Sequence, residues 1–144
     1  MHVRPLAICA VLSLAASAAG AQEVLTYPVD GTVEDAAFLL ESAIVGEGLV
    51  IDFTSHVGEM LARTGADMGA GGSPVGAAQA FVFCSATVSR EVMEADPANV
   101  AFCPYSVFAA EIDGRTVVGY RIYPGDSMAP VNELLARIVA AATE

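Results

Sequence analysis

Apolar and polar residues follow one another in a pattern that predicts alternating strands and helices. Short apolar runs predict five strands, at residues 24–29, 49–53, 80–84, 105–112 and 116–123. The last two are joined by Asp113-Gly114, a favoured pair for the tight turn of a hairpin. Apolar residues at helical spacing predict four helices, which start after Thr32, near His56, near Val88 and at Pro130. This order predicts a two-layer α/β sandwich, in which helices pack on a mixed sheet of about five strands.

Local motifs predict where several helices begin and end. Thr32 and Asp35 have the spacing of a capping box, in which a hydroxyl and a carboxylate each accept a hydrogen bond from the other residue's backbone amide. Thr54 and Ser55 are expected to cap the second helix, and Gly65 is expected to end it. The glycine-rich segment that follows, residues 66–76, is predicted to be a loop.

Residues 1–21 have the features of a cleaved signal peptide. Their apolar run is shorter than the roughly 20 residues of a membrane span, and it ends in the small-x-small pattern Ala19-Gly20-Ala21. Cleavage there leaves a single α/β domain, residues 22–144, which we expect to be periplasmic or secreted and to have no stable membrane anchor. Cys84 and Cys103 then remain in a compartment that permits disulfides.

The charge of the chain narrows the choice of partners. Seventeen aspartates and glutamates stand against six lysines and arginines, which gives a formal net charge of −11. Such a surface repels phosphate backbones, so nucleic acid is not an expected partner. Cationic proteins and metal cations are the partners that this charge favours, although the acidity has a simpler explanation in the solubility of an exported protein.

The two remaining cysteines allow three kinds of chemistry. A structural disulfide between Cys84 and Cys103 is the simplest, and it requires Cα atoms within about 7 Å and therefore antiparallel strands at that point. Free thiolates would instead extend a metal site towards copper(I) or zinc. A thiol-based redox or sulfur-handling enzyme is the third possibility, but the chain has no Cys-x-x-Cys motif and no complete catalytic motif.

His56 and Met60 are candidate ligands for a metal or for haem. They lie four residues apart on a predicted helix, and they therefore share one face. An imidazole and a thioether suit copper or haem iron, and such a haem would be bound non-covalently because the chain has no Cys-x-x-Cys-His motif. The structural alternative is that Met60 fills the core and that His56 packs at the start of the helix.

Several short strings of the chain, from about residue 27 to residue 123, resemble a known family. They are Gly48-Leu49-Val50-Ile51, Ser55-His56-Val57-Gly58-Glu59-Met60-Leu61 before Thr64-Gly65, Phe81-Val82-Phe83-Cys84, Met93-Glu94-Ala95-Asp96-Pro97 and Cys103-Pro104-Tyr105. Together they are similar to the uncharacterised family called domain of unknown function 302. The resemblance implies a compact α/β domain that often self-associates, so a homodimer is expected, and it implies no particular reaction.

The chain departs from the common pattern of that family at both cysteines. Many members carry a Gly-Asn-Pro-type turn in place of Cys84-Ser85-Ala86, and Leu-Pro in place of Cys103-Pro104. The resemblance therefore assigns no role to either cysteine. We favour a periplasmic module that binds haem or copper through His56 and Met60. The alternatives are a non-catalytic interaction module stapled by a disulfide and, less favoured, the thiol-based enzyme.

Overall fold

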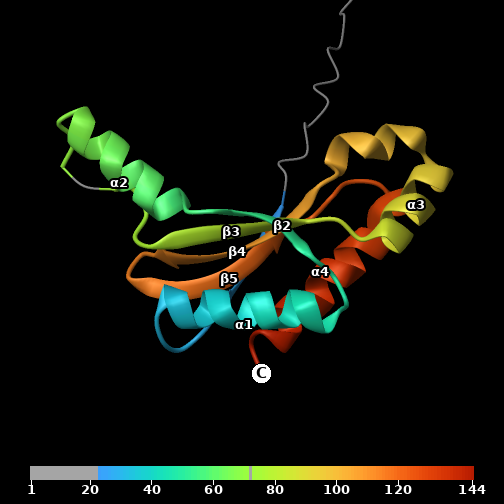
Figure 1. Cartoon of the computed structure of the whole chain (residues 1–144), viewed down its shortest axis with the longest axis horizontal. Helices are drawn as coiled ribbons and strands as arrows, with labels where there is room; N and C mark the ends of the chain where they lie inside the picture. Colours follow the sequence, from blue (N-terminus) through green and yellow to red (C-terminus); the bar gives the residue numbers. More distant parts are fainter. Residues whose placement is uncertain (1–22, 72) are drawn as a thin grey trace, which may run out of the picture.

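The computed structural model describes residues 23–71 and 73–144, so the predicted signal peptide lies outside the described residues. The strands are β1 (Val24–Pro28), β2 (Ile51–Ser55), β3 (Ala78–Phe83), β4 (Tyr105–Ile112) and β5 (Arg115–Arg121). The helices are α1 (Val33–Gly46), α2 (Val57–Asp67), α3 (Ala86–Ala95) and α4 (Ala129–Ala141) (Figure 1). Two 3₁₀ helices, η1 (Pro97–Phe102) and η2 (Asp126–Met128), were not predicted.

The strands form one sheet in the order β1-β5-β4-β3-β2. The two-layer α/β architecture with five strands is confirmed, but the prediction of a mixed sheet is wrong, because every pairing is antiparallel. The reason lies in the connections. Each of β3, β4 and β5 reverses the direction of the strand before it, whereas α1 carries the chain from β1 to β2 at the opposite edge, so these two parallel strands never pair.

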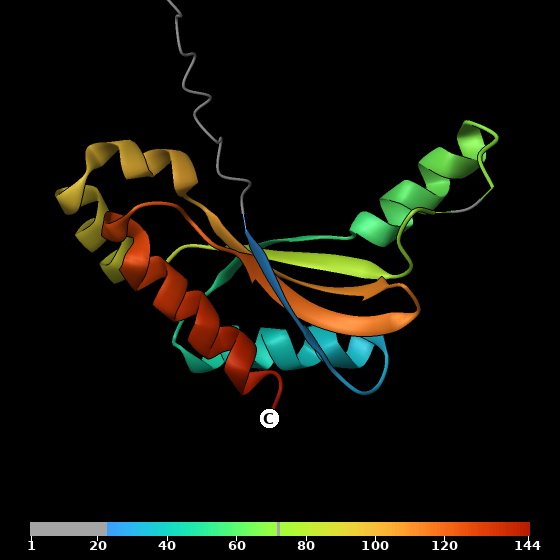
Figure 2. The ribbon, with the colours of Figure 1, turned by 180° about the vertical axis from the view of Figure 1, so that it is seen from behind.

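One face of the sheet is covered by α1 and α4, which lie side by side below the sheet in both views (Figures 1 and 2). Alternate residues of each strand point towards α1 and α4, so the core lies between one face of the sheet and the apolar faces of these two helices. Its largest fully buried side chains are Tyr105, Tyr123, Phe81, Phe83, Leu40, Ile44, Met128, Leu135, Ile138, Val92, Val107 and Val118. No helix of the described part of the chain is both long and apolar enough to cross a membrane.

Two of the predicted local signals are confirmed in detail. The Thr32 hydroxyl accepts a hydrogen bond from the Asp35 backbone N–H at 3.1 Å, and the Asp35 carboxylate accepts one from the Thr32 backbone N–H at 3.0 Å. The Thr32 hydroxyl also donates a hydrogen bond to the Asp35 carboxylate at 2.8 Å. The two bonds that the carboxylate accepts, from the Thr32 backbone N–H first and from its hydroxyl second, lower the pKa of the Asp35 carboxyl. In the β4–β5 hairpin, Asp113 and Gly114 both have positive φ, 52° and 72°, as a tight primed turn requires.

The predicted ends of the second helix are wrong at both sides. Thr54 and Ser55 do not cap α2 but continue β2, where they pair with β3, and His56 occupies the N-cap without a side-chain hydrogen bond. The helix also runs through Gly65 as far as Asp67. The glycine that takes a left-handed conformation and reverses the chain is Gly69, with φ of 69°.

Candidate functional site

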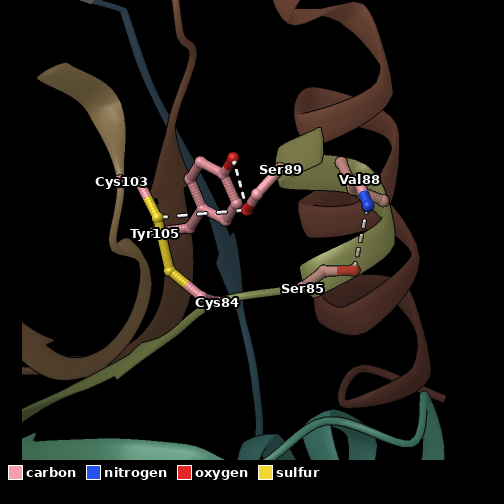
Figure 3. The surroundings of a disulfide bond; sticks show 6 residues. All are labelled: Cys84, Ser85, Val88, Ser89, Cys103 and Tyr105. Atoms are coloured by element: carbon pink, nitrogen blue, oxygen red, sulfur yellow. Dashed lines mark hydrogen bonds between the residues drawn. A yellow bond between two sulfur atoms is a disulfide. The ribbon is translucent and has the colours of Figure 1, made fainter. Parts of the chain in front are cut away.

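Cys84 and Cys103 are joined by a disulfide at one end of the sheet (Figure 3). Cys84 directly follows β3 and Cys103 comes just before β4, and these strands are antiparallel, with Phe83 opposite Tyr105. The Cα atoms of the two cysteines are 6.7 Å apart, which meets the distance that the sequence analysis required. In this form neither sulfur is a thiolate, and it is the thiolate that binds metal ions.

The disulfide lies against the first turns of α3. The Ser89 hydroxyl is 3.9 Å from the Sγ atom of Cys103 and 3.1 Å from the Tyr105 hydroxyl (Figure 3). Ser85 caps the helix, because its hydroxyl accepts a hydrogen bond from the Val88 backbone N–H at 3.3 Å. The disulfide thus links the end of β3 to the start of β4 and closes the loop that contains α3 and η1. A disulfide in this position is expected to stabilise the fold.

His56 and Met60 lie at the other end of the sheet. His56 follows β2, whose last residue, Ser55, pairs with Ala80, four residues before Cys84 and therefore roughly 13 Å away along β3. The His56 side chain is exposed, and the Met60 side chain is 47% exposed. The four residues predicted as metal ligands therefore do not meet at one site: His56 and Met60 lie at one end of the sheet, and Cys84 and Cys103 lie at the other.

Metal-binding side chains do not cluster elsewhere in the described part of the chain. Among residues 23–71 and 73–144, no three histidine, cysteine, aspartate or glutamate side chains are placed to hold a metal ion together. A shallow open pocket of about 660 Å³ lies near the β4–β5 turn and the start of α1, and its lining includes Asp30, Leu39 and Arg115 but none of the four predicted ligands. Binding of haem or copper by His56 and Met60 stays a prediction.

The second face of the sheet is not covered by α1 or α4 (Figures 1 and 2). Its residues are identified by register, since they pair with one another across the sheet and alternate with the residues that face the core. We call them the open sheet face: Val24, Thr26 and Pro28 of β1, Arg115, Val117, Gly119 and Arg121 of β5, Ser106, Phe108, Ala110 and Ile112 of β4, Ala78, Ala80 and Val82 of β3, and Phe53 and Ser55 of β2.

Apolar side chains predominate on the open sheet face, and Asp52, the extra residue at the irregularity of β2, is the carboxylate that lies next to it. Phe53 is 63% exposed and Val24 is 53% exposed, at opposite edges of the sheet. Arg115 and Arg121 are the charged residues that the regular register places on this face. The exposed apolar residues of α1 have different surroundings, because Phe38, which is 67% exposed, has Glu34 and Glu41 four and three residues away on its own helix.

Helix α2 extends away from the sheet on the side opposite to α1 (Figures 1 and 2). Gly58 is its one buried residue, and it packs closely on the chain entering β3: a Cβ atom there would lie 2.6 Å from the Ala78 nitrogen and 2.7 Å from the Gly76 oxygen. Further along, Met60 and Met68 are 47% and 78% exposed. Glycine is thus needed where the helix is anchored, and the rest of α2 stands clear of the core.

Arg121 sits at the end of β5 on the open sheet face, where it pairs with Val24 of β1. Its guanidinium carbon is 4.8 Å from the centre of the Tyr123 ring. The Arg121 Nε atom and the Tyr123 hydroxyl are both buried and have no hydrogen-bond partner among the described residues. The sequence analysis did not single out either residue, since a lone arginine at the end of a strand matches no motif.

The comparisons with known proteins bear on fold and family. A crystal structure of an uncharacterized conserved protein DUF302 from Bacillus stearothermophilus superimposes with a TM-score of 0.66 over 84% of this chain and 98% of that chain. The two sequences are 15% identical, so this likeness shows the fold alone. No curated protein matches the chain. The family model "Domain of unknown function DUF302" matches residues 25–143. The chain therefore belongs to the DUF302 family.

Proposed function

We propose that the protein is an exported, disulfide-stapled interaction module that forms a homodimer through its open sheet face. The observation that carries this proposal is the composition of that face, which presents apolar side chains from all five strands and has Asp52 as the carboxylate at its β2 edge. In a chain with a net charge of −11, this is the surface on which a second, equally acidic copy meets the least repulsion. A contiguous apolar surface of this kind typically marks an interaction site.

The size of the open sheet face supports a dimer. Five strands about 4.8 Å apart and about six residues long span roughly 24 Å by 20 Å. A specific interface buries about 800 Å² on each partner. The sheet alone supplies a large part of that area, and α2, which leaves the sheet on the same side, supplies more (Figure 1). Two sheets that pack face to face keep a spacing of about 10 Å, which apolar side chains such as Phe53 and Phe108 fill.

The disulfide and the predicted signal peptide support the exported location. Disulfides persist in oxidising compartments, and Cys84 and Cys103 are bonded here. We prefer the interaction module to a haem or copper protein because His56 and Met60 are exposed at the start of α2 and lie far from both cysteines. We prefer it to a thiol enzyme because the bridge has the position of a staple between β3 and β4.

The proposal is tested by the molar mass of the purified protein in sedimentation equilibrium over a range of concentrations. We expect a dimer, and we expect Phe53→Glu to shift it towards the monomer, because the variant places two like charges in the apolar interface. Phe38→Glu is the matched control, since Phe38 is as exposed but lies on α1, and it should leave the dimer intact. A wild-type protein that is monomeric throughout, or a dimer that dissociates only in Phe38→Glu, contradicts the proposal.

A further inference from the structure

Helix α2 has few of the interactions that normally stabilise a short helix. Gly58 is its one buried residue, and its N-cap residue, His56, makes no capping hydrogen bond with its side chain. Neither ion pair of the described residues includes a residue of α2. A helix of 11 residues that packs on so little is marginal in water. We therefore expect α2 to be completed by a surface from outside the protomer.

The base of α2 is held firmly on the sheet at both ends of the segment that carries it. At the outgoing end, Gly58 packs on the chain entering β3. At the returning end, the Gly76 N–H donates a hydrogen bond to the Glu111 carbonyl at 3.2 Å, and the Glu111 N–H donates one to the Ala77 carbonyl at 2.8 Å. A Cβ atom on Gly76 would lie only 2.8 Å from the Glu111 Cβ atom. The direction of α2 is thus set before any partner binds, which lowers the entropic cost of binding.

The two sides of α2 differ in chemistry. The charged residues Glu59, Arg63 and Asp67 lie four residues apart and share one side of the helix. Largely apolar residues recur at spacings of three and four and share another side, which we call the arm face: Val57, Met60, Leu61, Thr64 and Met68. Because Met60 and Met68 are exposed, one protomer covers the arm face only in part.

The proposed dimer needs more area than the open sheet face supplies. That face spans about 480 Å², whereas a specific interface buries about 800 Å² on each partner. Helix α2 leaves the sheet on the side of the open sheet face (Figures 1 and 2). Its 11 residues span about 16 Å, which exceeds the spacing of about 10 Å between stacked sheets. A second copy on the open sheet face therefore lies within reach of α2.

We infer that α2 is an arm of the homodimer, and that its arm face packs on the second copy chiefly through Met60 and Met68. This inference rests on the proposed homodimer. The arm face carries no charge, so it meets an equally acidic copy without repulsion, while Glu59, Arg63 and Asp67 stay in water. Methionine is unbranched and flexible, and it therefore adapts to the surface that it contacts. Two-fold symmetry gives each dimer two such arms, one from each copy.

Polar substitutions on the arm face test this contact. The double variant Met60→Gln/Met68→Gln keeps the helix propensity and the net charge but makes both side chains polar. We expect its dimer to dissociate at least roughly tenfold more readily than that of the wild type in sedimentation equilibrium, because apolar contacts are lost. Arg63→Gln is the matched control, since it introduces the same residue on the charged side of the same helix. Its dissociation constant should stay within about threefold of the wild-type value.

Methionine oxidation gives a second readout without any substitution in α2. Hydrogen peroxide converts an accessible thioether to the sulfoxide and is itself reduced to water. Met60 and Met68 should react more slowly in the wild-type dimer than in monomeric Phe53→Glu. Met128 is fully buried within the protomer, so it should react slowly in both and serves as the internal reference. Trypsin cleavage after Arg63 places Met60 and Met68 in different peptides, so mass spectrometry follows each one separately.

The outcomes separate this inference from the function on which it rests. Suppose that the wild type is a dimer that Phe53→Glu dissociates. If Met60→Gln/Met68→Gln then dimerises no more weakly than Arg63→Gln, or if Met60 and Met68 react equally fast in dimer and monomer, the arm is overturned while the proposed function stands. If the wild type is monomeric at every concentration, both are overturned. A weaker dimer in the double variant alone, together with slower oxidation in the wild-type dimer, establishes the arm. Circular dichroism and thermal unfolding confirm that each variant is folded.

Discussion

Asn132 of α4 holds both backbone groups of Tyr123. Its Oδ1 atom accepts a hydrogen bond from the Tyr123 N–H at 2.9 Å, and its Nδ2 atom donates one to the Tyr123 carbonyl at 2.9 Å. Tyr123 is only 1% exposed, so its backbone groups have no ready replacement in water. We expect Asn132→Ala to lower the free energy of unfolding by roughly 2 kcal/mol in urea denaturation. A loss no larger than that of Glu133→Ala, the exposed neighbour on the same helix, would show that these bonds contribute little.

The disulfide is expected to contribute substantially to stability. Cys84 and Cys103 are 19 residues apart, and closing a loop of this length stabilises the folded state by about 3 kcal/mol on the chain-entropy model. Reduction by dithiothreitol should therefore lower the free energy of unfolding by about that amount. The double variant Cys84→Ser/Cys103→Ser should unfold like the reduced wild type and should not respond to the reductant. Equal stability of the oxidised and reduced protein would contradict the role of a staple.

The capping box of α1 should make stability depend on acid pH. The hydrogen bonds from Thr32 hold the pKa of the Asp35 carboxyl below its ordinary value of about 3.9, so the folded state favours the charged form. The stability that this carboxylate supplies is complete above that ordinary value and is lost as the pH falls through the lower folded-state pKa. Asp35→Asn should therefore be less stable than wild type at pH 6, and the difference should shrink towards pH 2.

The measurement for the capping box is the free energy of unfolding between pH 2 and pH 6. Glu34→Gln is the control, because Glu34 is exposed in the same turn of α1 and takes no part in the capping box. Thr32→Ala removes the other half of the box and should cost roughly 1 kcal/mol at pH 6. A difference between wild type and Asp35→Asn that stays constant with pH would contradict the role of the Asp35 charge.

Binding of haem or copper by His56 and Met60 has a direct spectroscopic test. The protein purified under native conditions should show, if the prediction holds, a visible band that shifts on reduction with dithionite and is lost in His56→Ala and in Met60→Leu. A spectrum without visible bands, together with metal analysis that finds less than one copper per chain after copper loading, would contradict it. The double variant Cys84→Ser/Cys103→Ser is the control: it should keep the visible band if His56 and Met60 bind the ligand without the distant cysteines.

Features set by neighbouring residues were predictable from the sequence. The capping box needs only Thr32 and Asp35, and the β4–β5 turn needs only Asp113 and Gly114, and both signals act within four residues. The start of α2 was misjudged because Thr54 and Ser55 are common caps, yet pairing with β3 outweighed this local preference. Cys84 and Cys103 can lie close together only if β3 and β4 are antiparallel, and the sequence did not decide whether these two strands are parallel or antiparallel.

The open sheet face could not be predicted because β3 is apolar on both sides. Phe81 and Phe83 point to the core, but Val82 and Ala80 between and before them are also apolar, so a period of two does not reveal which side is uncovered. The contact between Arg121 and the Tyr123 ring was missed for a related reason, since it depends on where β5 ends in the sheet.

The position of β1 has a consequence for the order in which the protein folds. Residues 24–28 pair with residues 117–121, although β2, β3 and β4 all lie between them in the chain. Closing so long a loop is entropically costly and slow, so the meander from β2 to β5 is free to assemble first. Until β1 docks, the backbone of β5 is an unpaired edge that is open to aggregation. A tag or truncation close to Val24 therefore interferes with the last step of sheet assembly. We expect it to lower the yield of folded protein during expression more than it lowers the free energy of unfolding of the folded protein.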